Sequence, residues 1–153
     1  MDDLLFIDAK GPFNSEAVHD FQKSLHLATM TLENLPRWYQ LAVLHEVSIF
    51  TPDAMDELFK VTQWRMTKGL AASAVVFVGT MSKQLSRIQI GAMYQELGLK
   101  HEFFDSVEAA TSWIDNLRSE SPWTGRLGLS GTSNQIRVQS ESRTPSRGLH
   151  FCR

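Results

Sequence analysis

The sequence predicts a single α/β domain with four helices and a mostly parallel or mixed sheet of four or five strands, followed by a disordered C-terminal tail. Three observations lead to this fold class. Residues 71–79 form a short apolar run rich in β-branched residues between two turn signals, which indicates a strand buried on both faces. Strand-like and helix-like segments alternate from residue 4 to residue 118 with short connections, as in parallel sheets with right-handed crossovers. Beyond residue 118 the periodicity stops.

The first strand-helix pair begins at the N-terminus. Residues 4–9 have strand character and are followed by a Gly-Pro turn. Asn14 is a natural helix N-cap, with Phe13 and Val18 in the two positions of a hydrophobic staple. Apolar residues then recur on one helical face until Pro36 ends the helix, which makes this the most clearly marked helix of the chain.

The second strand-helix pair covers residues 38–69. Residues 38–47 have strand character, and Thr51-Pro52 is a strong helix start, because the threonine satisfies one free backbone donor and the proline removes another. Acidic side chains favoured by the helix dipole occupy the first turn, namely Asp53, Asp56 and Glu57. We expect Gly69 to end the helix and its buried face to be Met55, Leu58, Phe59, Thr62 and Met66, with Trp64 near the border.

Two further helices follow the central strand. The first covers residues 82–97 and ends at Gly98, and a short strand follows at residues 100–104. Asp105 and Glu108 have the spacing of a capping box at the start of the last helix. Its buried face is expected to consist of Val107, Ala110, Ile114 and Leu117.

The third helix carries two apolar stripes where an amphipathic surface helix has one. One stripe consists of Met81, Leu85, Ile88 and Ala92, and the other of Ile90, Tyr94 and Leu97. The simplest interpretation is that the extra stripe packs against a neighbouring helix. A second chain or an apolar ligand would also cover it.

Composition divides the chain into a domain, residues 1–118, and a tail, residues 119–153, that is rich in Ser, Thr, Gly, Pro and Arg. The formal charge is about −5 over the domain and about +3 over the tail, and the net value of −2 argues against general nucleic-acid binding. The tail has too few apolar residues to offset its ordering entropy. The single cysteine, Cys152, fits a reducing compartment. No secretory leader and no run of 18 apolar residues is present, so we expect a cytoplasmic protein without a membrane span.

No segment carries a strong catalytic, metal-binding or cofactor-binding signature. A two-component receiver domain is disfavoured, because Asp8 has no acidic neighbour and the expected aspartate and lysine at later strand ends are missing. None of the five histidines has metal-ligand spacing. His45 and Glu46 are neighbours on a predicted strand, which sends them to opposite faces and argues against an acid-base pair.

The turn after the central strand leads into a helix whose free backbone N–H groups could hold an anion, with Thr80, Lys83 and Arg87 nearby. The glycine spacing of a phosphate-binding P-loop is absent. An ordinary capped loop is therefore the simpler interpretation.

Several short motifs occur in an order that is characteristic of a known family. They are Lys10-Gly11-Pro12-Phe13-Asn14, Trp38, Thr51-Pro52-Asp53-Ala54, the segment from Gly69 to Gly79, and the segment from Phe104 to Ile114, in which a Phe-Asp pair precedes an alanine-rich turn and a tryptophan. Over about residues 4–117 the chain resembles the SpoIIAA-like branch of the STAS superfamily, small bacterial α/β proteins related in fold to anti-sigma-factor antagonists and to SEC14-type lipid-binding domains.

The resemblance implies a non-enzymatic domain with a mixed sheet and helices largely on one face. Family members have one more N-terminal strand, so either the first strand here leaves an exposed edge or the true start lies upstream. Partner-switching antagonists are phosphorylated on a serine at the start of the helix after the third strand. At that junction this chain offers Thr51 as a displaced acceptor or Asp53 as a fixed negative charge, although Thr51 also has a structural role as N-cap.

Three functional hypotheses follow. The first is a regulatory module that binds a protein partner or a second copy of itself through Thr51, Asp53 and the second helix, which carries Asp56 and Trp64. The second is a binder or sensor of a small apolar, lipid-like ligand lodged between the sheet and the third helix, near Ile90 and Tyr94. An enzyme ranks third, because we expect no reactive groups to converge on the sheet.

Overall fold

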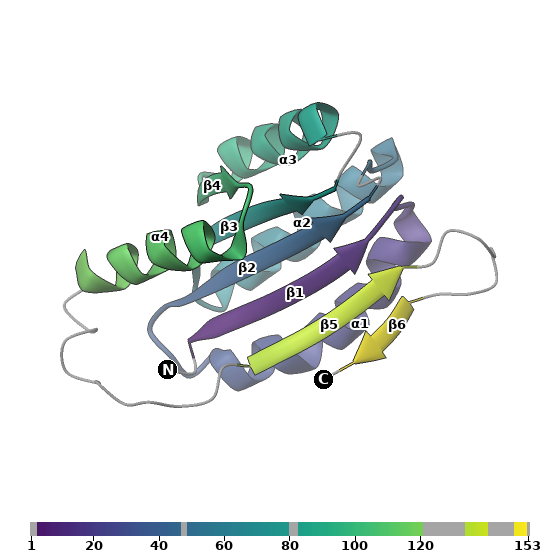
Figure 1. Cartoon of the computed structure of the whole chain (residues 1–153). Coiled ribbons are helices and arrows are strands. Elements are labelled where there is room, and N and C mark those ends of the chain that lie inside the picture. The colour runs from purple at the N-terminus through teal and green to yellow at the C-terminus, as the bar shows by residue number, and fades with distance from the viewer. Residues whose placement is uncertain (1–2, 47–48, 80–82, 121–133, 141–148, 153) are drawn as a thin grey trace.

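The computed structural model describes residues 3–46, 49–79, 83–120, 134–140 and 149–152 (Figure 1). Strands and helices alternate through Glu120, and two further strands follow. The elements are β1 Leu4–Lys10, α1 Ser15–Leu32, β2 Trp38–His45, α2 Pro52–Thr67, β3 Leu70–Val78, α3 Lys83–Leu97, β4 Lys100–Phe104, α4 Val107–Glu120, β5 Asn134–Ser140 and β6 Leu149–Cys152.

All six described strands form one sheet in the order β4-β3-β2-β1-β5-β6. The first five are mutually parallel where they pair, and β6 is antiparallel to β5, so the sheet is mixed (Figure 1). The predicted α/β class, with four alternating strands and helices, is confirmed. The sheet has two strands, β5 and β6, that the sequence analysis did not predict.

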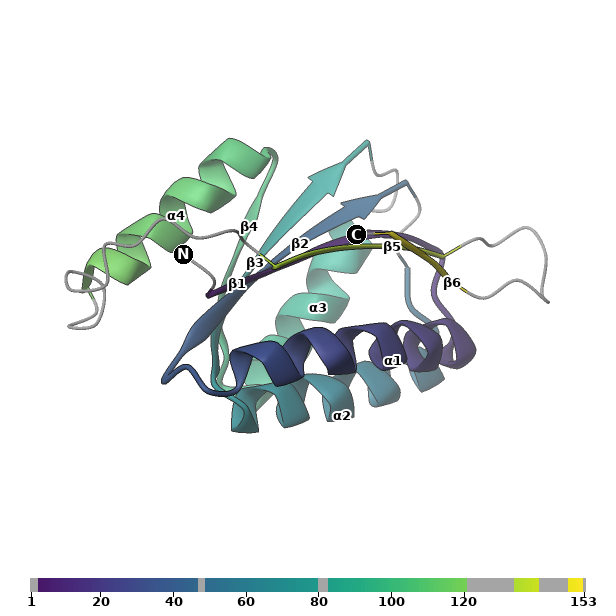
Figure 2. The same cartoon turned by 90° about the horizontal axis from the view of Figure 1, so that it is seen from below.

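Helices cover both faces of the sheet. The helices α1 and α2 lie on one side and α4 on the other (Figure 2), and α3 shares the core of α1 and α2. Alternate residues of β3 point into each core, with Val75 and Phe77 under α1 to α3 and Ala74 and Val76 under α4. The two-sided burial predicted for this strand is confirmed, since every residue from 72 to 77 is buried.

Helix caps form largely as predicted. Asn14 Oδ1 accepts a hydrogen bond from the Ala17 amide at 2.8 Å, and Gly69 adopts a φ of +109° at the end of α2. The predicted capping box, with Asp105 as N-cap of α4, is wrong by one residue. Ser106 caps α4 instead, accepting from the Ala109 amide at 3.2 Å, while Asp105 pairs with Lys83.

The first strand does not lie at an edge, because β5 pairs with it in parallel on the side away from β2. The tail was expected to lack regular structure from residue 119; α4 extends to Glu120, and β5 and β6 occupy two parts of the remainder. Residues 121–133, 141–148 and 153 lie outside the described residues. Of the helices that the structure describes, none has the length and apolar character to cross a membrane.

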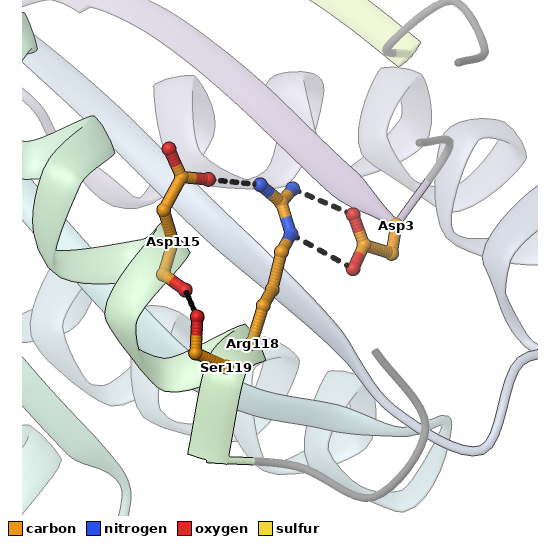
Figure 3. Close-up of polar contacts among 4 residues, drawn as sticks. All are labelled: Asp3, Asp115, Arg118 and Ser119. Atoms are coloured by element: carbon orange, nitrogen blue, oxygen red, sulfur yellow. Dashed lines mark hydrogen bonds and ion pairs between the residues drawn. The ribbon is translucent and has the colours of Figure 1, made fainter. Parts of the chain in front are cut away.

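The C-terminal end of α4 is tied to the chain just before β1 (Figure 3). Two nitrogens of the Arg118 guanidinium donate to the Asp3 carboxylate, at 2.6 and 3.1 Å, and the third donates to Asp115 at 2.6 Å. Burial alone would lower the pKa of Arg118, but the hydrogen bonds and charges of Asp3 and Asp115 outweigh it and raise that pKa. This contact fixes α4 over the sheet.

Candidate functional site

The loop before α2 is held by the loop before α1. The Phe13 amide donates to the Ile49 carbonyl at 2.9 Å, and the Thr51 amide donates to the Phe13 carbonyl at 3.0 Å. The rings of Phe13 and Phe50 stack with centroids 4.7 Å apart, and both are buried. Thr51 is therefore an exposed residue on a fixed backbone, and its Oγ1 caps α2 by accepting from the Ala54 amide at 3.2 Å.

A side chain from α3 ties the same loop to a third element. The Gln89 amide donates to the Phe50 carbonyl at 2.8 Å and accepts from the Phe50 amide at 3.1 Å. This two-way contact mimics a backbone pair and satisfies both polar groups of Phe50. No local sequence pattern pointed to Gln89, because its partner lies on a different element.

The structure brings three of the four predicted partner-site residues together. Thr51, Asp53 and Asp56 are all exposed in the first turns of α2. Trp64 lies near the other end of this helix, where its ring stacks on His26 of α1 with centroids 4.9 Å apart. Trp64 is thus part of the contact between α1 and α2 rather than of the surface around Thr51.

Next to this surface, a groove of about 430 Å³ separates α2 from α3. Its apolar lining comes from Met55, Phe59, Ala92 and Met93, and its polar lining from Asp56, Lys60, Gln89 and Glu96. Met55 and Phe59 pack against the core, as their predicted place on the inward face of α2 implies, but both side chains are only partly buried. Asp56 belongs both to the predicted partner surface and to the groove.

The two apolar stripes of α3 differ in exposure. Ile90 and Tyr94 are buried in the core, whereas Leu85 and Ile88 are 47% and 67% exposed. Ser86, Ile90, Met93 and Tyr94 are the buried residues of α3, and the last three belong to the core cluster that includes α1 and α2. Ile90 and Tyr94 therefore face the core rather than solvent, and a ligand near them would lie between α3 and the sheet.

The residues predicted as candidates for an anion site do not converge on one site in the described structure. Lys83 pairs with Asp105 at the end of β4, and the Arg87 guanidinium lies 5.3 Å from the centre of the Phe103 ring. Thr80 lies outside the described residues. The two described cations thus engage groups around β4 rather than a common anion site.

A polar cluster that was not predicted lies inside the core between β2, β3 and α3. The Gln40 amide donates to Ser73 Oγ at 3.1 Å and to Tyr94 Oη at 3.3 Å, and the two hydroxyls are 3.1 Å apart. Burial raises the pKa of Tyr94, although Ser73, Gln40 and a nearby arginine charge act in the opposite direction. Gln40 Oε1 is buried without a hydrogen-bond partner.

That arginine, Arg65 of α2, is only 1% exposed. It donates to Gln22 Oε1 at 3.3 Å and to Thr62 Oγ1 at 3.2 Å, both uncharged, and its Nε has no partner. Burial lowers its pKa to about 10, while the Tyr94 hydroxyl raises it, so the side chain is charged at neutral pH. Within the described part of the chain, no carboxylate lies within ion-pair distance of Arg65. The sequence predicted no convergence of reactive groups on the sheet, and it did not predict this buried polar cluster of Gln40, Ser73, Tyr94 and Arg65.

A cavity of about 40 Å³ lies between the sheet and the helices at this cluster. Arg65, Gln40 and Tyr94 supply its polar lining. The apolar lining comes from β1, β2, α1, α2, α3 and two loop residues, namely Ile7, Ala9, Phe13, Phe21, Ala42, Leu44, Phe50, Leu58 and Ile90. Arg65 is not among the residues predicted for the buried face of α2, and charged side chains are rarely fully buried.

One more polar pair lies at the carboxyl ends of β1 and β2. His45 Nε2 is 2.7 Å from Asp8 Oδ1, and Glu46 instead pairs with Lys10 at 3.2 Å. His45 and Glu46 therefore diverge, in agreement with the argument against an acid-base pair between them. Among the described residues, no group of three His, Cys, Asp or Glu side chains is placed to hold a metal ion.

Comparison of the chain with protein-family models, with curated proteins and with solved structures found no match. The features of the described residues that point to a function are the groove between α2 and α3, the exposed start of α2 and the cluster around Arg65.

Proposed function

We propose that this chain is a non-catalytic, STAS-type regulatory module of the cytoplasm that binds a protein partner through the groove between α2 and α3. The observation that carries the proposal is the groove itself, with a volume of about 430 Å³, half-buried Met55 and Phe59 in its wall, and the exposed start of α2 at its side. Grooves of this size between helices are common binding sites.

The lining indicates an amphipathic helix as the occupant. Methionine and phenylalanine side chains adapt to apolar anchors spaced by three or four residues, which is how helices dock in grooves. Asp56 and Glu96 border the groove, with Asp53 close by on the same helix, and Lys60 is the single cation among its lining residues. Charge complementarity therefore favours a partner helix with Lys or Arg beside its apolar anchors.

The site is also held rigidly before binding. Gln89 joins α3 to Phe50, and the Phe13 backbone joins Thr51 to the loop before α1. A surface that is already ordered loses less conformational entropy when a partner binds. The contacts around Phe50 thus support recognition as well as folding.

Regulation at Thr51 fits this arrangement. Its hydroxyl oxygen lies at the N-terminus of α2, where a phosphate would gain from the helix dipole. A phosphate there would add negative charge next to Asp53 and so alter the affinity for a basic partner helix. Phosphorylation of Thr51 is the modification we propose for this module.

The test uses a displayed library of helical peptides selected against the folded protein. We expect selected peptides to carry apolar residues at helical spacing with flanking basic residues. Phe59→Glu should weaken their binding at least tenfold, or about 1.4 kcal/mol, as expected for an anchor contact. Leu85→Glu is the matched control, because Leu85 is an exposed apolar residue on the outer face of α3.

Asp56→Lys provides a second test that leaves the core untouched, since Asp56 is exposed. It should weaken binding of basic peptides and reduce the salt dependence of the affinity. If Leu85→Glu abolished binding while Phe59→Glu and Asp56→Lys did not, the partner would use the outer face of α3 and the proposal would be wrong.

A second candidate function, binding of a small ligand in the core, is favoured by the cavity beside Arg65. Its volume of about 40 Å³ is roughly a quarter of the 150 Å³ that accommodates benzene in an engineered protein cavity. A lipid-like ligand would therefore require α2 or α3 to move. Native mass spectrometry after mild purification would detect such a ligand as a lipid-sized adduct.

A further inference from the structure

We propose that the cavity beside Arg65 is a binding site for a compact monovalent anion, no larger than nitrate or formate. This site is separate from the groove between α2 and α3, and its existence does not depend on the partner proposed above. Four features of the structure carry the inference: a buried charge, a set of hydrogen-bond donors, the cavity volume and the apolar walls.

The buried charge is the guanidinium of Arg65. A charged side chain taken out of water is strongly destabilised unless an opposite charge compensates it. The two protein groups that accept its hydrogen bonds, Gln22 Oε1 and Thr62 Oγ1, are neutral, and Nε has no acceptor. An anion in the adjoining cavity would supply the missing charge.

The donor set suits an anion. Tyr94 contributes a hydroxyl and Gln40 an amide to the same cavity wall as Arg65. In the orientation described, Gln40 Oε1 has no donor. Rotating the amide by half a turn lets Oε1 accept from the Ser73 or Tyr94 hydroxyl and turns Nε2 into a free donor, an exchange that costs no change in shape.

Volume and wall chemistry limit the anion. A water molecule needs about 10–15 Å³ of probe volume, so the 40 Å³ at this site hold roughly three waters or one small anion. Phe13, Phe21, Phe50, Leu58 and Ile90 form most of the remaining wall. These apolar side chains offset no charge, so the single positive charge of Arg65 compensates one negative charge but not a second. Sulfate and doubly charged phosphate are therefore disfavoured.

The site also joins the parts of the domain that form the groove. Arg65 belongs to α2 and Tyr94 to α3, and Gln40 comes from β2 beneath them. An anion held by all three residues would fix α2 and α3 to the sheet. Anion binding should therefore raise the thermal stability of the folded chain.

The experiment measures Tm for the full chain at constant ionic strength while sodium gluconate, whose anion is too large for the cavity, is replaced by sodium nitrate or sodium formate. We expect a saturable rise of Tm in the wild type. Arg65→Met, which keeps the length of the side chain without its charge, should show no saturable rise and should have a Tm in gluconate no lower than the wild type. Equal saturable rises in the wild type and in Arg65→Met would overturn the proposal.

Gln40→Glu is the second variant, and it keeps the test decisive if Arg65→Met fails to fold. Its carboxylate would enter the cavity with nearly the shape of glutamine and compensate Arg65 from within, so the response to nitrate and formate should disappear. A Gln40→Glu protein with the full wild-type response would contradict the site. Sodium hexanoate distinguishes a free anion from the head of an acyl chain, since a larger rise with hexanoate than with formate would overturn the size limit.

Discussion

Removing one partner of the ion pair between Arg118 and Asp3 should cause a large and specific loss of folding stability (Figure 3). The side chains are only 16% and 12% exposed and share two hydrogen bonds in the parallel geometry of a carboxylate and a guanidinium. Replacing Arg118 by Met keeps an unbranched apolar side chain but removes the guanidinium, which lies 5.8 Å from the centre of the Tyr39 ring, and leaves the Asp3 charge buried and unpaired. Breaking a buried pair in this way costs about 3–5 kcal/mol.

The lower end of that range applies, because both side chains retain some access to water and Asp115, the other partner of Arg118, is 58% exposed and adds little. We therefore expect Arg118→Met to lower the free energy of unfolding by about 3 kcal/mol, or to lower Tm by roughly 6–12 °C for a chain of this size. Asp3→Asn alone should lower the free energy of unfolding by less than Arg118→Met does. The asparagine amide keeps one oxygen that can accept a hydrogen bond from Arg118.

Urea denaturation followed by circular dichroism measures these differences, and the double variant closes a thermodynamic cycle. The two changes together should cost clearly less than the sum of the single changes, with a coupling of at least about 1.5 kcal/mol. Arg37→Met, at an exposed arginine, is the control and should stay within about 0.5 kcal/mol of the wild type. If Arg118→Met matched this control, α4 would not be held to the sheet by this contact.

Three further predictions test other parts of the structure. Thr51→Ala should lower the free energy of unfolding by about 1 kcal/mol and Thr51→Asp should not, because aspartate also caps a helix, and denaturant titration compares the two. Gly69→Ala should cost more than 1 kcal/mol and perturb tryptophan fluorescence, because φ is +109° and a Cβ would lie 3.0 Å from the indole of Trp38; an unchanged midpoint and spectrum would contradict this packing. Burial raises the pKa of Tyr94 above the ordinary value of 10.0, so in Tyr39→Phe, which retains Tyr94 as its single tyrosine, tyrosinate absorbance should appear only above pH 10 while the fold is intact. Ionisation at or below that pH in the native variant would show that Tyr94 is not enclosed.

Local signals predicted the fold. The cap at Asn14, the Thr51-Pro52 helix start and Gly69 each depend on neighbours within one turn, and the structure confirms all three. The apolar run of β3 likewise predicts burial of the strand from its own residues, and residues 72–77 are buried. The error at Asp105 is also local, because Asp and Ser are equally good caps and Ser106 stands one residue closer to the helix.

Contacts between distant elements could not be predicted from the residues alone. Arg65 has helical spacing with the buried Leu58 and Thr62 of α2, but a charged side chain is almost never fully buried, so its position alone did not predict that it lies in the core. The pair formed by Asp8 and His45 depends on the register of β1 against β2. The choice between the two stripes of α3 likewise depends on what the sheet presents, since both have helical spacing.

The two C-terminal strands were missed because their composition resembles that of a solvated tail. Residues 134–140 read Asn-Gln-Ile-Arg-Val-Gln-Ser, a short alternation with few apolar side chains in a Ser- and Arg-rich region. Backbone hydrogen bonding to the free edge of β1, which no sequence pattern displays, determines where β5 lies.

The most direct test of the proposed function is amide hydrogen exchange of the full chain with and without a selected helical peptide. If the peptide docks between α2 and α3, exchange should slow at residues 52–60 and 89–96 and remain unchanged along α1 and α4. Protection that falls on α1 or α4 and leaves both of those segments unchanged would show that the groove is not the binding site.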